Sequence, residues 1–227
     1  MIPRPENPLI VALDVSDLDA AEALARSLEG RVGLLKVGLE LFAGHGPAAV
    51  LRLRTYAPVF LDVKLHDIPS TVEGAARNCA RMGVDMVTVH ALGGEAMIAA
   101  AARGAAQGAE GSGHPMPRIL AVTVLSSLAG ESLATAASLA YESTAAGATG
   151  VVVSGEDVAV VREVLGEQAC LVVPGIRLPG SNGHDQLRIL TPQAAVERGA
   201  DYLVIGRPIT ASDDPAGAAK AIVSSVR

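Results

Sequence analysis

Short apolar runs and amphipathic segments alternate eight times along the 227 residues of the chain. The runs are continuously apolar, as expected of strands that are buried on both faces of a parallel sheet. The segments between them carry apolar residues at helical spacing, so we expect a helix after every strand. The expected strands cover residues 9–15, 34–37, 59–63, 86–90, 119–124, 150–153, 171–173 and 203–205. The expected helices lie within residues 17–28, 47–54, 70–82, 94–107, 131–146, 156–165, 192–198 and 215–226.

This alternation predicts an α/β fold, a (β/α)8 TIM barrel, as a single domain over residues 1–227. A doubly wound sheet usually has fewer strands and carries a G-x-G-x-x-G motif after the first one, and no such motif follows Val15. No linker or shift in composition divides the chain. We expect the glycine-rich residues 107–117 to be irregular surface structure, and residues 178–186 to form a functional loop, or lid.

The composition limits the partners and the compartment. A formal net charge of −6 disfavours nucleic acid or an anionic membrane as the main partner. The two cysteines, Cys79 and Cys170, have no metal-binding spacing, which fits a reducing compartment. Residues 1–8 contain three prolines and lack the apolar core of a signal peptide or a membrane anchor. We therefore expect a cytoplasmic protein.

Charged residues stand where several of the predicted strands end. Asp62 and Lys64 lie two residues apart at the end of the third strand, so we expect their side chains to point to the same face. Asp67 follows in the next loop, and Asp14 and Lys36 end the first and second strands. A structural ion pair would explain Asp62 and Lys64 alone. Because barrel enzymes place reacting groups at the carboxyl ends of strands, the convergence of both signs of charge there favours a catalytic site.

A second group of residues is typical of phosphate binding. Arg177 follows the seventh strand, and Gly206 and Arg207 follow the eighth. In barrels a phosphate is commonly bound at these two loops, where a glycine lets the anion approach the backbone and a guanidinium offers paired donors. His90 ends the fourth strand, and we expect it to be a hydrogen-bonded barrel histidine, because no second histidine stands at metal-binding spacing.

Five segments in order resemble the orotidine 5'-phosphate decarboxylase family, which makes UMP in pyrimidine biosynthesis. They read Ala12-Leu13-Asp14, Leu35-Lys36-Val37-Gly38, Asp62-Val63-Lys64-Leu65-His66-Asp67-Ile68-Pro69, Pro174-Gly175-Ile176-Arg177 and Ile205-Gly206-Arg207-Pro208-Ile209-Thr210. The similarity runs from about residue 9 to residue 222. It implies a cofactor-independent decarboxylase that converts orotidine 5'-monophosphate to UMP.

The resemblance also implies a role for each matching residue. Lys64 would protonate the C6 carbanion, Asp62 and Asp67 would set its electrostatics, and Lys36 would complete the charge array. Asp67 and Thr71 would reach the neighbouring subunit's site, so the active form would be a homodimer. The other implied substrate contacts are Asp14 and Lys36 at a ribose hydroxyl, Ser126 at the pyrimidine, and Arg177, Gln186, Gly206 and Arg207 at the phosphate.

Two alternatives compete with this interpretation. A 3-keto-gulonate 6-phosphate decarboxylase has a similar barrel and a D-x-K-x-x-D stretch, but it binds Mg²⁺ through acidic residues, and Lys36 stands where a carboxylate would be needed. A catalytically silent barrel that binds a phosphorylated regulator would need only the arginines. It would leave the array of Asp62, Lys64 and Asp67 unexplained. We therefore expect an enzyme that needs no metal or other cofactor.

Overall fold

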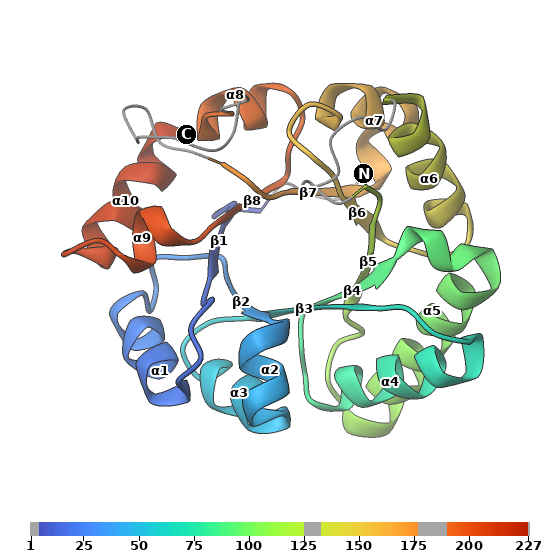
Figure 1. Cartoon of the computed structure of the whole chain (residues 1–227), viewed down its shortest axis with the longest axis horizontal. Helices are drawn as coiled ribbons and strands as arrows, with labels where there is room; N and C mark the ends of the chain where they lie inside the picture. Colours follow the sequence, from blue (N-terminus) through green and yellow to red (C-terminus); the bar gives the residue numbers. More distant parts are fainter. Residues whose placement is uncertain (1–4, 125–132, 177–189, 227) are drawn as a thin grey trace.

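The computed structural model describes residues 5–124, 133–176 and 190–226. Within these residues, eight parallel strands form a closed barrel in sequence order from β1 to β8. The barrel closes because β1 pairs with both β2 and β8. Figure 1 shows the strands as a ring, seen from one end of the barrel, with the helices packed around its outside. The predicted (β/α)8 TIM barrel is confirmed.

The strands are short and largely buried. Every residue of β1, β2 and β7 is buried, because one face of each strand lines the barrel interior and the other packs against helices. The third strand runs two residues beyond its predicted end, and the first stops earlier than predicted. The strands are β1 (Leu9–Ala12), β2 (Leu34–Gly38), β3 (Val59–Leu65), β4 (Met86–His90), β5 (Arg118–Val122), β6 (Gly150–Val152), β7 (Cys170–Val173) and β8 (Tyr202–Ile205).

The helices begin where the sequence offers caps and prolines. The Asp17 side chain accepts a hydrogen bond from the N–H of Ala20 and so caps α1. Proline occupies the first turn of α3, α4, α8 and α10. The helices are α1 (Leu18–Ser27), α2 (Leu39–His45), α3 (Pro47–Leu53), α4 (Pro69–Arg81), α5 (Gly94–Ser112), α6 (Leu133–Ala145), α7 (Val158–Leu165), α8 (Pro192–Glu197), α9 (Arg207–Thr210) and α10 (Pro215–Ser225), with 3-10 turns at Ala91–Gly93 and Gly166–Gln168. None of the helices in the described ranges is long and apolar enough to cross a membrane.

Helix α5 corrects one prediction, because it continues through the glycine-rich stretch to Ser112. Two of its glycines face the neighbouring helix α4 at very short range. A Cβ atom on Gly104 would lie 2.1 Å from the carbonyl oxygen of Glu73, and one on Gly108 would lie 2.2 Å from that of Arg77. These glycines therefore allow the two helices to pack closely. The helix ends at Ser112, and Gly113 caps it in the left-handed backbone conformation.

Two layers of apolar side chains form the core. The larger layer lies between the strands and the surrounding helices. The smaller layer fills the barrel interior and consists of Ile10, Leu34, Phe60, Met86, Leu120, Cys170, Val172 and Tyr202. Most of these interior residues stand in the first half of their strands, so the barrel is filled at its amino end. The carboxyl ends of the strands are left free to surround a cavity.

The close contact between α4 and α5 predicts a difference between two glycine substitutions in the same helix. Gly104→Ala should lower the free energy of unfolding by about 1–3 kcal/mol, because the new methyl group would overlap the α4 backbone. Gly111→Ala is the matched control, since a Cβ there meets nothing within 4 Å, and it should raise stability by about 0.5–1 kcal/mol. Urea denaturation measures both. Equal stability of the two variants would contradict the close packing.

Candidate active site

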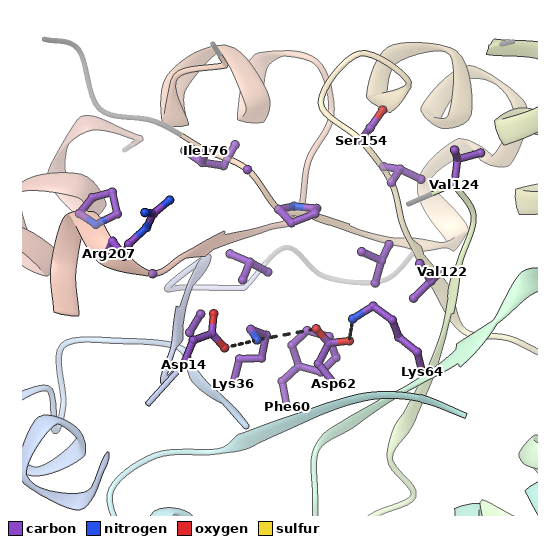
Figure 2. A pocket seen from close by; sticks show the side chains of 18 residues that line it. Asp14, Lys36, Phe60, Asp62, Lys64, Val122, Val124, Ser154, Ile176 and Arg207 are labelled. Carbon is purple, nitrogen blue, oxygen red and sulfur yellow. Dashed lines mark hydrogen bonds and ion pairs between the residues drawn. The ribbon is translucent and has the colours of Figure 1, made fainter. Parts of the chain in front are cut away.

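A cavity of about 330 Å³ opens at the carboxyl ends of the strands (Figure 2). Phe60, which is 1 % exposed, lines its deep side. The other apolar lining residues include Val122, Val124, Val152, Val153, Pro174, Ile176, Val204 and Pro208. The charged lining residues are Asp14, Lys36, Asp62, Lys64 and Arg207. Charges in such an apolar setting need partners of opposite sign or a bound ligand.

Four of the predicted residues form a row of alternating charge. Asp14 Oδ1 lies 2.8 Å from Lys36 Nζ, which lies 3.8 Å from Asp62 Oδ2. The other oxygen of Asp62, Oδ1, lies 2.9 Å from Lys64 Nζ. The Lys36 side chain is only 10 % exposed, so its ammonium depends on the two carboxylates, whereas Lys64 at 39 % is open to the cavity. We call Asp14, Lys36, Asp62 and Lys64 the charge row.

The strand that carries half of the charge row is irregular. Leu61 and Leu65 of β3 pair with Val87 and Val89 of β4, so β3 contains extra residues in a bulge between them. Within this bulge Lys64 has a φ of 49°, the one positive value at a non-glycine residue in the described part of the chain. A left-handed backbone costs an ordinary residue about 1–2 kcal/mol. The surrounding contacts must therefore hold Lys64 in place.

Thr88 is a buried residue of this region that the sequence analysis missed. Its hydroxyl accepts a hydrogen bond from the backbone N–H of Lys64 at 2.8 Å and donates one to Asp62 Oδ1 at 3.0 Å. The available signal was a lone threonine inside the apolar run Met86–His90. That signal carries little weight in a sequence, because threonine is also common in ordinary strands.

Glycines shape the cavity on either side of Asp14. A Cβ atom on Gly38 would lie 3.0 Å from Asp14 Oδ1 and 3.1 Å from Lys36 Nζ, so the glycine leaves room for this ion pair. Gly206 stands directly before α9, and a Cβ atom on it would lie 4.0 Å from Asp14 Oδ2. Asp14 is therefore the member of the charge row that lies next to Gly206. Figure 2 shows Arg207 across the cavity from Lys64.

Comparison with known proteins identifies the family. Residues 7–222 match the model of the Orotidine 5'-phosphate decarboxylase / HUMPS family. This chain belongs to that family. A protein from Anaeromyxobacter sp. (strain K) that is named orotidine 5'-phosphate decarboxylase is 48 % identical to this chain over 234 residues. The match covers 98 % of this chain and 100 % of the relative. The one from Moorella thermoacetica is 46 % identical over 233 residues, covering 97 % and 92 %.

Solved structures of the family have the same fold. The crystal structure of orotidine 5'-phosphate decarboxylase from Lactobacillus acidophilus superposes with a TM-score of 0.84 at 35 % identity and covers 97 % of this chain and 99 % of that one. The predicted resemblance to the orotidine 5'-phosphate decarboxylase family is thus confirmed over nearly the whole chain.

Not every predicted site residue lines the cavity of this one chain. Asp67 and Thr71 are exposed and do not line it. The Asp67 carboxylate instead accepts a hydrogen bond from the N–H of Ile68 at 2.6 Å. The remaining predictions, for Ser126, Arg177 and Gln186 and for the loop over residues 178–186, fall outside the described residues.

Two histidines stack beside the charge row. The rings of His66 and His90 are 5.1 Å apart and nearly parallel. Burial lowers the pKa of His90, and the charges of His66 and Lys64 lower it further, which favours the neutral ring. Its Nδ1 accepts a hydrogen bond from the N–H of Leu92 at 3.3 Å. Across the described ranges, no group of three or more His, Cys, Asp or Glu residues is arranged to hold a metal ion.

The two cysteines lie apart from the charge row, in α4 and in β7, and neither lines the cavity. Both thiols are free and buried, and burial raises the pKa of Cys79 and of Cys170 to about 11. A thiol must lose its proton to act as a nucleophile, so we expect both to be unreactive in the folded protein.

We predict that iodoacetamide leaves the native protein unmodified near neutral pH, because both thiols are protonated and shielded. In concentrated urea their pKa values return toward about 8.5, and both should be alkylated. Mass spectrometry of the two samples measures the added groups. Rapid modification of either cysteine in the native protein would contradict the burial of that thiol.

Proposed function

We propose that this protein decarboxylates orotidine 5'-monophosphate to UMP in the cytoplasm, without a metal or other cofactor. The observation that carries the proposal is the charge row, which presents the Lys64 ammonium to an otherwise largely apolar cavity beside a carboxylate held at 2.9 Å. Relatives that bear the name of this enzyme share 41–48 % of their residues with the chain, which supports the same activity here.

The proposed chemistry is electrostatic. Loss of CO2 leaves an electron pair on C6 of the pyrimidine, where the ring delocalises it poorly. An ammonium about 4 Å away stabilises this charge by roughly 4 kcal/mol at an effective dielectric constant near 20, which is about three decades in rate. Lys64 then gives a proton to C6 and recovers one from water. Asp62 keeps the ammonium aimed at C6 and repels the substrate carboxylate until CO2 leaves.

The rest of the cavity suits the remainder of the nucleotide. Asp14 ends the charge row beside Gly206, where its Oδ2 is available to a ribose hydroxyl while Oδ1 is held by Lys36. Arg207 supplies a guanidinium for the 5'-phosphate at the far side of the cavity (Figure 2). Binding energy from this remote phosphate contributes to lowering the barrier at C6. Arg177, Gln186 and Ser126 remain predicted contacts of the phosphate and the pyrimidine.

Lys64→Ala should lower the rate of CO2 release by at least about three decades, because it removes both the stabilising charge and the proton donor. UMP should still bind, with affinity within about tenfold of wild type, since the phosphate and ribose contacts remain. The fall in absorbance of orotidine 5'-monophosphate measures turnover, and calorimetric titration measures UMP binding. Lys220→Ala is the matched control, because Lys220 is exposed on α10.

Two outcomes of this assay would contradict the proposal. Activity that EDTA abolishes and Mg²⁺ restores would favour a metal-dependent sugar-phosphate decarboxylase. Such a metal would have to bind close to Lys36, whose ammonium would repel it. Ligand binding without turnover in the wild-type protein would favour a silent barrel that senses a phosphorylated molecule.

The proposal includes a homodimer whose subunits complete each other's sites. Asp67 and Thr71 are exposed on their own subunit, where they do not line the cavity. Three large apolar side chains follow the ends of the adjacent strands β2, β3 and β4: Leu39, Ile68 and Leu92 are 63 %, 64 % and 62 % exposed. A second subunit that covers these side chains would bring its own Asp67 to the same rim.

The shared site predicts complementation between two inactive variants. Lys64→Ala and Asp67→Ala homodimers should each be inactive, but a mixed dimer has one site with both native residues. Random reassembly after mild denaturation should therefore restore about a quarter of wild-type activity. Differently tagged subunits and pull-down verify that mixed dimers form. Mixed dimers without recovered activity would place Asp67 in its own subunit's site or outside catalysis.

A further inference from the structure

Thr88 lies on β4 beside the bulge in β3, and none of its surface is exposed. One hydroxyl group contacts both halves of the catalytic pair: it accepts from the Lys64 backbone N–H and donates to Asp62 Oδ1. The same Oδ1 accepts a hydrogen bond from Lys64 Nζ. A closed set of three hydrogen bonds therefore connects the Lys64 backbone, its ammonium and one carboxylate oxygen through Thr88.

This arrangement fits the irregular backbone of β3. The bulge interrupts the regular pairing between β3 and β4, so the N–H of Lys64 bonds to a side chain instead of a strand carbonyl. A lysine rarely adopts the left-handed conformation seen here unless its surroundings hold it. Without the hydroxyl, a buried N–H would lose its partner, and Asp62 would lose the neutral donor that orients it.

Thr88 does not line the cavity, so it has no route to contact the substrate. We propose that Thr88 is a positioning residue: its hydroxyl fixes the Asp62 carboxylate and the Lys64 backbone together, so that the Lys64 ammonium faces C6 of the substrate. This inference rests on the proposed decarboxylase function, because it assigns Thr88 an effect on the chemical step and none on nucleotide binding.

Three substitutions separate the hydroxyl from the rest of the side chain. Thr88→Val keeps the shape and removes the hydroxyl, and Thr88→Ala removes both the hydroxyl and the methyl group. Thr88→Ser keeps the hydroxyl. We expect kcat to fall by about 10- to 100-fold in the valine and alanine variants, as misplacement of a catalytic group by about 1 Å does, and by less than about threefold in the serine variant. KM and UMP affinity should stay within about threefold of wild type in all three variants.

Thr149→Val is the control for losing a threonine hydrogen bond elsewhere. Thr149 precedes β6 at the amino end of the barrel, where its hydroxyl donates to the Ile119 carbonyl at 3.3 Å. We expect this variant to lose stability in urea denaturation without a change in kcat. If the valine variant does not fold, the ratio of kcat between the serine and alanine variants decides the question.

The outcomes distinguish the inference from the function on which it rests. An active wild type with a fully active Thr88→Val or Thr88→Ala variant overturns the positioning role alone. A loss of UMP affinity that parallels the loss of kcat also overturns it. So does a Thr88→Ser variant that is as slow as Thr88→Ala. Either result would mean that Thr88 has only a structural role. A wild-type protein that does not release CO2 overturns the proposed function and the inference together.

Discussion

A lysine ammonium held between two carboxylates inside the barrel is the interaction on which the rest of the site depends. Lys36 is nearly buried and pairs with both Asp14 and Asp62, so its positive charge offsets the repulsion between the two carboxylates. Asp62 pairs with Lys36 through one oxygen and with Lys64 through the other. The buried Lys36 ammonium therefore helps to fix the position of the more exposed Lys64 ammonium through Asp62. The alternating signs make the row neutral as a whole, which lets four charges share one largely apolar cavity.

The closed parallel sheet is what brings these charges together. In a barrel all strand ends with the same direction meet at one rim, so residues far apart in the sequence become neighbours. The register places Lys36 opposite Ala12 and Asp62 opposite Gly38, which sets the ends of β1, β2 and β3 side by side. Apolar side chains fill the amino end of the barrel and leave the charged end hollow.

Most of the fold could be predicted because its signals are local and repeated. Continuously apolar runs separated by helical periodicity gave the eight strands and their order of alternation. Helices α2 and α9 were missed because each is short and directly follows a strand, which leaves little periodicity to detect. The end of α5 was misplaced for a different reason: Gly108 and the glycines after it indicate a loop locally, but the contact of Gly108 with α4 requires glycine within a helix.

The sequence by itself indicated the barrel class and the residues of the charge row, because Asp14, Lys36, Asp62 and Lys64 all stand at the ends of predicted strands, which meet at one rim of a barrel. Only the tertiary structure revealed the bulge in β3, the left-handed backbone of Lys64 and the part played by Thr88. It also showed that Asp67 does not line the cavity of its own chain. The physical reason is that register shifts and side-chain bonds between strands depend on partners distant in the sequence, which no local pattern records.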